Sequence, residues 1–553
     1  MSHPKSSWFW LLAVGGLLFG GISCTESSTN STPQSRATGP KAAEDDRSYL
    51  SALQAIDPST NFYVNRQRAQ LFAAQAKSAQ KPFDRFRLTH LSADELAKAG
   101  DPAEALRRLD PLIAQLPSQR SETTDQIERQ LRFSALTAAL RLGELENCIQ
   151  EKCCDSCVFP ISGDGVHVHP AGSRRAIAEV DQLLDREPER LELIWLRNLL
   201  AMTLGEWPHA VPEAFRIDPE AFADDREVPR FFDIAPEAGV DVVGLSGGAS
   251  LEDFDGDGHL DVFVTSWGQK DPVRYFRATG DGKFEDRTEA AGLAGITGGL
   301  NCNHADFDND GDTDVLILRG AWLGPQGSHP NTLLRNDGGR FVDVTMSSGL
   351  LSRRPTQTAA WGDYDGDGDL DLFIGNETAM GARHACELFE NQGDGTFVEV
   401  AAEVGLAKFA WVKGVAWGDF DNDNDLDLYV SVLDGPNSLY ENLGSESGRP
   451  KFKDIASSAG VSLPRFSFPT WFFDYDQDGR LDILVGSYGD FENDRLVGVV
   501  ARYLDRPSHD EGIKLYRNLG GGKFEDVSAA VGLDHPVLPM GSNFGDIDGD
   551  GWL

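Results

Sequence analysis

Residues 253–264 read DFDGDGHLDVFV, and the spacing of their acidic residues is typical of a loop that wraps a metal ion. Counted from Asp253, aspartates occupy positions 1, 3, 5 and 9, glycine occupies position 6, and position 7 would offer its backbone carbonyl. Alternate side chains of a tightly wound loop converge on one point, and Ca²⁺ takes about six to eight hard oxygen ligands in flexible geometry. The loop contains no soft ligand, which disfavours zinc and copper. These residues therefore predict a calcium site.

The same loop recurs along the second half of the chain. The first aspartates of successive copies are 53, 57, 56, 55 and 72 residues apart, and a period of this length indicates a repeat architecture. Five copies are complete and the sixth is partial. The predicted ligands, with position 7 counted for its carbonyl, are Asp253, Asp255, Asp257, His259 and Asp261; Asp306, Asp308, Asp310, Asp312 and Asp314; Asp363, Asp365, Asp367, Asp369 and Asp371; Asp419, Asp421, Asp423, Asp425 and Asp427; Asp474, Asp476, Asp478, Arg480 and Asp482; and Asp546, Asp548 and Asp550.

Position 12 distinguishes these loops from EF-hands, which need a bidentate glutamate there. It is apolar in the complete copies, as at Val264 and Ile317. Without the glutamate we expect weak calcium binding, in the ~10⁻⁴–10⁻³ M range of extracellular modules. The alternative is an acidic turn without metal, but such clustered carboxylates repel one another strongly unless a cation neutralises them. We therefore predict about one structural Ca²⁺ in each of the five complete loops and one partial site.

Short strands must position the loops. An apolar run such as LDVFV or LDLYV follows each loop, then a hairpin signal such as LLRNDGGRF, and then a Phe-x-acid segment such as FEDVSAAVGL that ends in Gly-Leu or Gly-Val. Four short strands in about 55 residues correspond to one blade of a β-propeller. The runs after the loops are apolar on both faces, so we expect the blades to stack face to face.

Aromatic residues accompany the loops. The ring at position 2 lies between ligands and must point away from the ion, which predicts a place in the core for Phe254, Phe307, Tyr364, Phe420 and Tyr475. Three tryptophans precede loops and either pack between blades, which we favour, or form a binding platform; they are Trp361, Trp417 and Trp471.

The N-terminal segment predicts export. Residues 8–19 form an apolar run that suits a signal peptide and is too short to span a bilayer. The small residues before Cys24 resemble a lipobox, so we predict a signal segment over 1–24 with lipidation at Cys24, the alternative being ordinary secretion. Residues 25–45, rich in Ser, Thr and Pro in their first part, are predicted to be a disordered tether.

Helical periodicity extends over residues 46–225. Apolar residues recur at three- and four-residue spacing around the Gly-Asp-Pro turn at 100–102, and again on both sides of Pro188. The pattern is similar to tetratricopeptide (TPR) helical pairs. We therefore predict a multidomain chain, with an all-α TPR-like domain over 46–225 followed by an all-β propeller over 228–553.

Two further segments are candidates for function. Cys148, Cys153, Cys154 and Cys157 crowd together before His167 and His169, but their spacing fits no standard zinc finger, and exported proteins favour disulfides. We predict one or two local disulfides among these cysteines rather than a metal site. An insertion near 487–512 in the fifth repeat is either a functional loop or, as we favour, a plain surface excursion. The sequence contains no GxSxG, HExxH, P-loop or dinucleotide-binding motif.

The formal net charge of −38 limits the partners. Nucleic acid and anionic membranes would be repelled, so we predict neither as a partner, apart from membrane attachment through a lipid on Cys24. An acidic chain suits a protein that neutralises carboxylates with bound cations, although an acidic surface kept for solubility would have the same charge.

Together the loops and the Phe-x-acid segments resemble FG-GAP/VCBS repeats, the calcium-loop propeller blades also found in integrin α heads. The pairing of WGDYDGDGDLDLFIG with FVEVAAEVGL is similar to the cartilage acidic protein family and its bacterial relatives, over about residues 230–553. The resemblance implies a propeller, with a signal or lipobox, a TPR-like region and a C-terminal ASPIC/UnbV domain in many bacterial members.

The chain ends at DIDGDGWL, one residue before the ninth position of the sixth loop, so we expect a fragment of a longer protein. FFDIAPEAGV at 231–240 has no preceding hairpin partner, which suggests that the last blade of a closed ring supplies one. We expect seven blades in the complete ring.

These features favour an exported, non-enzymatic interaction or adhesion module with structural calcium and an unknown protein or glycan ligand. One alternative is a propeller enzyme acting on polysaccharide, which convergent Asp, Arg and His around the central channel would favour. Another is a periplasmic assembly factor, which a polar groove in the helical domain would favour.

Overall fold

The computed structural model describes residues 46–54, 56–116, 121–149, 158–222, 233–445, 448–490, 495–504, 506–508, 511–533, 537–542 and 545. The chain divides into two compact units, and each is described by itself. The helical unit comprises Ala55–Ile234 and Gly489–Asp510. The sheet unit comprises Met1–Gln54, Ala235–Tyr488 and Glu511–Leu553.

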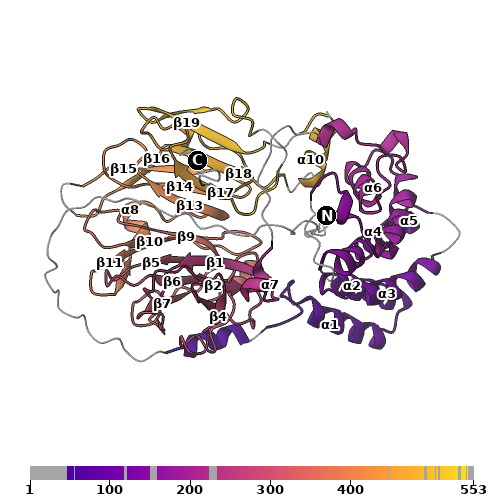
Figure 1. The fold of residues 1–553 in the computed structure, drawn as a ribbon, viewed down its shortest axis with the longest axis horizontal. Coiled ribbons are helices and arrows are strands. Elements are labelled where there is room, and N and C mark those ends of the chain that lie inside the picture. Colours follow the sequence, from indigo (N-terminus) through magenta and orange to yellow (C-terminus); the bar gives the residue numbers. More distant parts are fainter. Residues whose placement is uncertain are drawn as a thin grey trace. The chain divides into compact units, whose positions relative to one another are not determined.

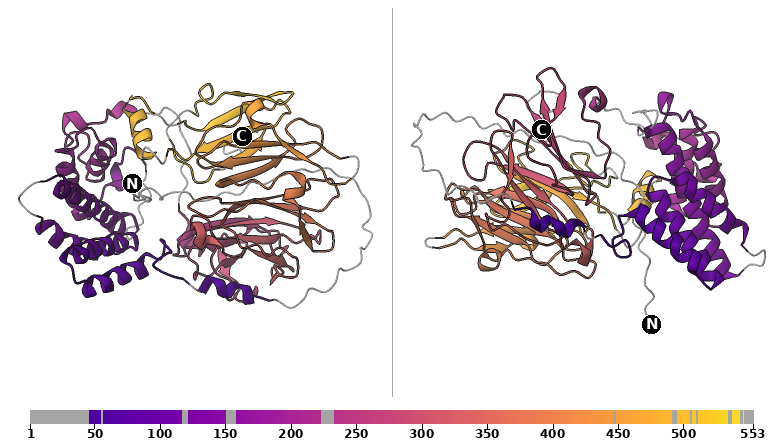
Figure 2. Two further views of the ribbon diagram at one scale, coloured as in Figure 1. Left: turned by 180° about the vertical axis from the view of Figure 1, so that it is seen from behind. Right: turned by 90° about the horizontal axis from the view of Figure 1, so that it is seen from below.

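Consecutive helices of the helical unit pack side by side, each against the next along the chain (Figures 1 and 2). A capping turn sets one of these junctions: Gly100 has φ of +79°, and the Asp101 carboxylate accepts the N–H of Glu104 at 3.3 Å. The predicted all-α character of this region is thus confirmed, and its likeness to TPR pairs stays a prediction. The helices are α1 (Asn65–Ser78), α2 (Pro82–Lys98), α3 (Pro102–Ala114), α4 (Glu122–Glu144), α5 (Ala171–Leu184) and α6 (Leu191–Thr203), with short turns at η2 (Leu145–Ile149), η4 (Gly163–Gly165), η5 (Glu213–Phe215) and η6 (Pro219–Phe222).

The insertion in the fifth repeat belongs to the helical unit. It forms helix α10 (Arg495–Tyr503), which packs against α6. Val500 is fully buried, and the Tyr503 ring lies 5.3 Å from Trp195 and 5.5 Å from Phe222, centroid to centroid. The interpretation of this segment as a plain surface excursion is therefore wrong, because burial of its apolar face holds it against the helices.

Five antiparallel sheets of four strands build the sheet unit, and every sheet follows chain order (Figure 1). The predicted order of strand, Asp loop and three further strands is confirmed in each, but the turn before the fourth strand is not always tight, since nine residues separate the third strand from the fourth in the fourth sheet. The sheets are β1 (Ser246–Glu252), β2 (Asp261–Ser266), β3 (Arg274–Ala278) and β4 (Phe284–Asp286); β5 (Asn301–Ala305), β6 (Asp314–Leu318), β7 (Thr332–Asn336) and β8 (Phe341–Asp343); β9 (Thr356–Gly362), β10 (Asp371–Asn376), β11 (Glu387–Asn391) and β12 (Phe397–Glu399); β13 (Val412–Gly418), β14 (Asp427–Val432), β15 (Ser438–Asn442) and β16 (Phe452–Asp454); and β17 (Ser467–Phe473), β18 (Asp482–Ser487), β19 (Lys514–Gly520) and β20 (Lys523–Asp526).

Neighbouring sheets stack face to face, as their doubly apolar strands predicted (Figure 2). One buried cluster joins Phe254 and Phe263 of the first sheet to Ile317 and Phe341 of the second. Three further clusters join the second sheet to the third, the third to the fourth, and the fourth to the fifth. The sheet unit is therefore propeller-like, with its core between the blades; the number of blades in a complete ring stays a prediction.

The segment before the helices belongs to the sheet unit. The turn η1 (Ser48–Gln54) buries Tyr49, Leu50 and Leu53 in the cluster between the first two sheets. The Tyr49 hydroxyl donates to Asp343 at 2.6 Å and lies 2.8 Å from the Thr332 hydroxyl. The prediction that the helical domain begins at residue 46 is therefore wrong for residues 46–54, because so short a segment has no periodicity of its own.

The Phe-x-acid segment closes each blade through its acidic residue. In all five sheets the carboxylate at the end of the fourth strand accepts the backbone N–H two residues on, as Asp454 does from Ala456 at 3.1 Å. The chain then turns through a glycine of positive φ, such as Gly460 at +84°. Within the described part of 231–240, the chain forms the helical turn α7 (Ala235–Ala238). Similar turns are α8 (Ala401–Val404) and α9 (Ala456–Ala459), whereas the short turn η7 (Gly324–Gly327) lies between β6 and β7.

Candidate metal centres

Strand register fixes both ends of each Asp loop. The residue before position 1 pairs with the aspartate at position 9, as Gly362 pairs with Asp371, so the loop must turn back on itself within eight residues. The same register recurs in the other four sheets. Each loop therefore starts at the end of the first strand and finishes at the start of the second, which is the condition for its side chains to converge.

The aspartate at position 1 winds the loop. Both of its carboxylate oxygens accept backbone N–H groups of the turn: Asp306 Oδ1 accepts from Asp310 at 3.1 Å and Oδ2 from Gly311 at 3.0 Å. Equivalent bonds are present in the other loops. Position 6 has positive φ, which glycine adopts without strain and which Asn424 adopts at +76° in the fourth loop.

The winding brings the aspartates at positions 1, 3 and 9 together. In every complete loop one carboxylate oxygen of each of these residues lies within 4.8 Å of the others. This confirms convergence for three of the predicted side-chain positions. The five triads are Asp253, Asp255 and Asp261; Asp306, Asp308 and Asp314; Asp363, Asp365 and Asp371; Asp419, Asp421 and Asp427; and Asp474, Asp476 and Asp482.

The aspartates at positions 5 and 7 make other contacts. The position 5 carboxylate, outside these triads, accepts the N–H of position 7 in all five loops, as Asp367 does from Asp369 at 2.9 Å. At position 7, the Asp312 carboxylate accepts the N–H of Gly338 at 2.8 Å, and the backbone carbonyl of this position as a ligand stays a prediction. The sixth loop, with Asp546, Asp548 and Asp550, lies outside the described residues.

In the absence of a cation, burial destabilises the ionised form of the position 9 aspartates. Asp314, Asp371 and Asp427 are at most 1% exposed. Burial, followed by the repulsion of the neighbouring aspartates, raises the pKa of each of these carboxyls to about 8, although backbone N–H groups donate to them. Burial likewise raises the pKa of Asp482 to about 6.

The position 3 aspartates supply a direct test of whether a cation fits. The Oδ1 atoms of Asp255, Asp308 and Asp476 are buried and, within the described part of the chain, have no hydrogen-bond partner. A buried carboxylate oxygen without a donor carries a desolvation cost, which a metal ion beside that oxygen would offset. The donors in the triads are hard oxygens only, which suits Ca²⁺. The residues therefore fit calcium, held by positions 1, 3 and 9, with charge neutralisation as its contribution.

Acidity should affect the chelated and calcium-loaded protein in opposite directions. Without calcium, burial raises the folded-state pKa of the position 9 carboxyls of the second, third and fourth loops to about 8, well above the usual range of an aspartate. A raised pKa means that stability is fully present at low pH and is lost as the pH rises through the folded-state value. We therefore expect the chelated protein to melt several degrees lower at about pH 8.5 than at about pH 6, whereas calcium removes or reverses this trend because it requires ionised ligands.

Scanning calorimetry across this pH range would measure the slope of melting temperature against pH, once in EGTA and once in excess calcium. Parallel slopes in the two buffers would contradict the assignment.

A repeated contact through one asparagine links each of the last four sheets to the loop of the sheet before it. In the last four sheets this asparagine ends the third strand or lies near its end, and its N–H donates to the position 9 aspartate of its own loop at 2.7–2.8 Å. Its amide Nδ2 donates to the carbonyl of position 2 in a preceding loop, as Asn391 does to Phe307 at 2.8 Å. The other three asparagines are Asn336, Asn442 and Asn518.

In the sequence this asparagine is recognisable only as part of a hairpin signal. Its partner in the preceding repeat is 78 to 98 residues away along the chain, and no local pattern identifies such a contact. The only visible signal was its recurrence just before the Gly-containing turn in four repeats. Ala278 takes its place in the first repeat, where the N–H still donates to Asp261 at 2.7 Å.

Changing Asn391 to aspartate should destabilise the sheet unit strongly. The Asn391 amide donates to the carbonyls of Phe307 and Leu370, so Asn391→Asp would place a buried carboxylate against two carbonyl oxygens. We expect a loss of about 3 kcal/mol or more. Urea denaturation followed by tryptophan fluorescence would measure it. The exposed Gln326→Glu makes the same chemical change and should cost less than about 0.5 kcal/mol; equal losses would refute the linking role.

The aromatic residues of the loops lie mostly where predicted. Phe254, Phe307, Tyr364 and Phe420 are at most 2% exposed and pack against the Phe that begins the fourth strand of the next sheet, or lies near its start, at centroid distances from 5.7 to 6.0 Å. Tyr475 is only half-buried, because no described sheet follows the fifth. The prediction of a core position is therefore wrong for that ring in the described structure.

Two of the three tryptophans pack between blades. Trp361 stacks on Phe307 at 6.3 Å, and Trp417 lies 6.1 Å from Phe452 while its indole N–H donates to the carbonyl of Ala360 at 3.2 Å. This confirms the favoured interpretation for both. Trp471 is half-buried in β17.

The cysteine cluster is only partly described. Cys148 Sγ lies 4.0 Å from His167 Nε2, and His167 Nδ1 lies 2.9 Å from the Ser173 hydroxyl. Cys153, Cys154 and Cys157 lie outside the described residues, as does Cys24. The predicted disulfides and the predicted lipidation therefore remain predictions.

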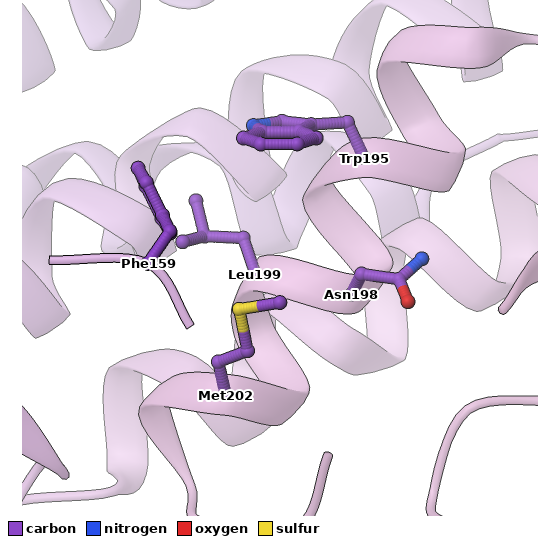
Figure 3. Close-up of a pocket in the computed structure, with 5 residues that line it drawn as sticks. All are labelled: Phe159, Trp195, Asn198, Leu199 and Met202. Carbon is purple, nitrogen blue, oxygen red and sulfur yellow. The ribbon is translucent and has the colours of Figure 1, made fainter. Parts of the chain in front are cut away.

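A shallow apolar recess of about 130 Å³ lies in the helical unit, lined by Phe159, Trp195, Asn198, Leu199 and Met202 (Figure 3). The side-chain amide of Asn198 in this recess already has hydrogen-bond partners. Asn198 donates to the carbonyls of Ile194 and Phe215 and accepts from the Trp207 indole at 3.0 Å. The Asn198 amide is therefore not free to orient a ligand in the recess.

Comparison with known proteins identifies the repeats. A family model described as FG-GAP-like repeat matches residues 253–317, 306–374 and 377–430, which include the first four Asp loops. Human cartilage acidic protein 1 is 26% identical over 333 residues, which cover 55% of this chain and 46% of that protein. The Xenopus tropicalis protein of the same name is 27% identical over 285 residues, covering 48% and 42%. The chain thus spans about half the length of the curated relatives it matches.

A crystal structure of the V. cholerae biofilm matrix protein Bap1 also matches, covering 51% of this chain and 39% of that one at 13% identity. Its TM-score of 0.31 is too low to support a conclusion. Within the described residues, no helix combines the length and apolar character needed to cross a membrane. The matched repeats and the sequence relatives lead to one conclusion. The chain contains FG-GAP-like repeats and is similar in sequence to cartilage acidic protein 1 over about half of its length.

Proposed function

We propose that this protein is an exported calcium-binding module whose sheet unit presents a rigid surface to a protein or glycan ligand. The observation that carries the calcium assignment is the repeated triad at positions 1, 3 and 9, in which buried position 3 oxygens lack donors in three of the loops within the described residues. Calcium would join the ends of the first two strands of each sheet. Its role is structural, because each triad lies at a strand junction that the ion would neutralise.

Export is supported by the apolar run at residues 8–19 and by the naming of the relatives for cartilage. We propose that the protein is secreted or anchored to the bacterial envelope through a lipid on Cys24. Subcellular fractionation of the wild type and of Cys24→Ala would test this. Cytoplasmic retention of the wild type would contradict export, and identical soluble secretion of both would contradict the anchor.

We favour a binding role over catalysis, since the sequence contains no GxSxG, HExxH, P-loop or dinucleotide-binding motif. Purified full-length protein applied to a glycan array and to immobilised matrix proteins, in calcium and in EGTA, would test it. We expect retention only in calcium, because the binding surface depends on ordered blades. Hydrolysis or cleavage of an arrayed polysaccharide would favour a propeller enzyme instead.

Direct measurement of calcium binding separates the metal assignment from the ligand assignment. Isothermal titration of the EGTA-treated protein should reveal about one Ca²⁺ per complete loop, five in all, in the ~10⁻⁴–10⁻³ M range. Asp371→Asn removes the buried carboxylate of the third loop and should remove one site. A flat titration would contradict the calcium assignment.

A further inference from the structure

Two of the five loops already contain a cation of the protein itself. In the first loop the Arg277 guanidinium forms ion pairs with Asp255 and, at 2.6 Å, with Asp257. In the fifth loop Arg517 lies 2.8 Å from Asp476 and 3.8 Å from Asp478. The aspartates that these arginines contact occupy positions 3 and 5 of their loops, and position 3 is a triad member.

The two arginines occupy one equivalent place in the fold. Arg277 is the fourth residue of β3 and Arg517 the fourth residue of β19, so each lies in the third strand of its sheet. The second sheet has Arg335 at this place, but its guanidinium turns to Asp337, with N–O distances of 2.9 and 3.1 Å. Among the described ion pairs, only the first and fifth loops therefore have their third-strand arginine paired with loop aspartates.

The third and fourth sheets have a glutamate at the same strand position. Glu390 accepts the Tyr364 hydroxyl at 2.7 Å and pairs with Arg449, and Glu441 lies 3.7 Å from Lys453. Among the described ion pairs, no Lys or Arg lies within 4.0 Å of a triad carboxylate in the second, third or fourth loop. The third-strand residue thus changes the charge beside the loop from positive to negative.

Loop position 7 follows the same division. It is aspartate in the second, third and fourth loops but His259 in the first and Arg480 in the fifth. The Arg480 guanidinium also pairs with Asp478, so the fifth loop is contacted by two arginines. Two independent positions, one in the loop and one in the third strand, therefore reduce the negative charge of the same two loops.

We propose that the third-strand residue sorts the five loops into two calcium-affinity classes. The second, third and fourth loops bind Ca²⁺ first. The first and fifth loops bind it more weakly, because an incoming ion must displace or repel an arginine that already neutralises positions 3 and 5. These two loops stay partly neutralised when calcium is scarce. This inference rests on the proposed calcium function and adds a ranking of the sites to it.

Titration of the full-length protein with Ca²⁺ should therefore resolve tighter binding to three loops from weaker binding to two. Terbium luminescence can identify the fifth loop, because Trp471 lies three residues before Asp474 and should sensitise an ion bound there. Trp471→Phe should remove emission that rises late in a Tb³⁺ titration, and Trp417→Phe should remove emission that rises early.

Arg517→Gln is the decisive variant. Its side chain is 39% exposed, so the substitution should leave the fold intact, which far-ultraviolet circular dichroism would verify. We expect Ca²⁺ affinity at the fifth loop to rise about tenfold or more when the opposing charge is removed. Arg335→Gln is the matched control, since it removes the same charge from the same strand position without breaking a loop contact, and should change affinity less than about threefold.

The outcomes separate the inference from the function on which it rests. Five equivalent sites, or an unchanged fifth loop in Arg517→Gln, would overturn the two classes and leave calcium binding intact. No binding of Ca²⁺ or Tb³⁺ at any loop would overturn both. Earlier filling of the fifth loop than of the fourth would overturn the ranking.

Discussion

Removal of calcium should lower the melting temperature of the sheet unit by about 10 °C or more. A ligand that binds only the folded state stabilises it by about 2.7 kcal/mol at a concentration one hundred times its Kd, and the contributions of independent sites add. Three tighter loops alone would contribute about 8 kcal/mol at that ratio. One kcal/mol moves the melting temperature of a domain of 150–250 residues by about 2–4 °C, so even part of this effect is large.

Calorimetry with excess calcium and with EGTA measures the shift. The ellipticity of α1–α6 supplies an internal reference, because the helical unit has no Asp triad among its described residues and its signal should respond less. Magnesium at the same concentration is the ion control, since its stricter octahedral geometry suits these loops less well. Equal melting in calcium and in EGTA would contradict the structural role of the ions.

A single substitution at Lys413, which lies outside the loops, should destabilise the sheet unit strongly. Lys413 in β13 is fully buried and pairs with Glu377, whose side chain is 2% exposed. The ammonium lies 3.4 Å from the centroid of the Trp322 ring, and burial lowers the pKa of Lys413 to about 8. Lys413→Met would leave the Glu377 carboxylate buried without its counter-ion, and we expect a loss of about 3–5 kcal/mol.

The double variant Lys413→Met with Glu377→Gln separates the stranded charge from lost packing. The backbone N–H of Trp322 donates to the Glu377 carboxylate at 2.8 Å, and the neutral amide of the glutamine can still accept this hydrogen bond. We therefore expect the double variant to recover most of the lost stability. Lys453→Met, at a lysine whose side chain is 64% exposed, should cost less than about 1 kcal/mol. Urea denaturation of the three variants provides the comparison. A double variant as unstable as the single one would show that the ion pair is not the cause.

Local patterns predicted much of the sheet unit. The Asp loops, the strands on both sides of them and the face-to-face stacking followed from side-chain spacing and from strands apolar on both faces, which are properties of a few adjacent residues. The helix boundaries around Gly100 followed in the same way from capping residues. Ligand convergence was predictable for positions 1, 3 and 9, since register and winding are both set within one hairpin.

Other features depend on residues far apart in the chain. The insertion that forms α10 packs against α6, which lies about 300 residues earlier in the chain, and the sequence of the insertion does not indicate this partner. Tyr49 reaches Asp343 across 294 residues, and Lys413 reaches Glu377 across 36. Composition predicts that such polar groups need partners, but not which ones.

The sequence by itself determined which residues can hold an ion and how often the unit repeats, because ligand spacing and strand period are written within each repeat. Only the tertiary structure decided how the repeats differ and how they are joined. Asn391 donates to the preceding loop, so its contact joins two neighbouring blades. Arg517 pairs with an aspartate of its loop, whereas Arg335 at the equivalent place pairs with Asp337, and the difference lies in the orientation of the side chain. Contact geometry of this kind arises only when the sheets pack, since it depends on distance in space rather than on distance along the chain.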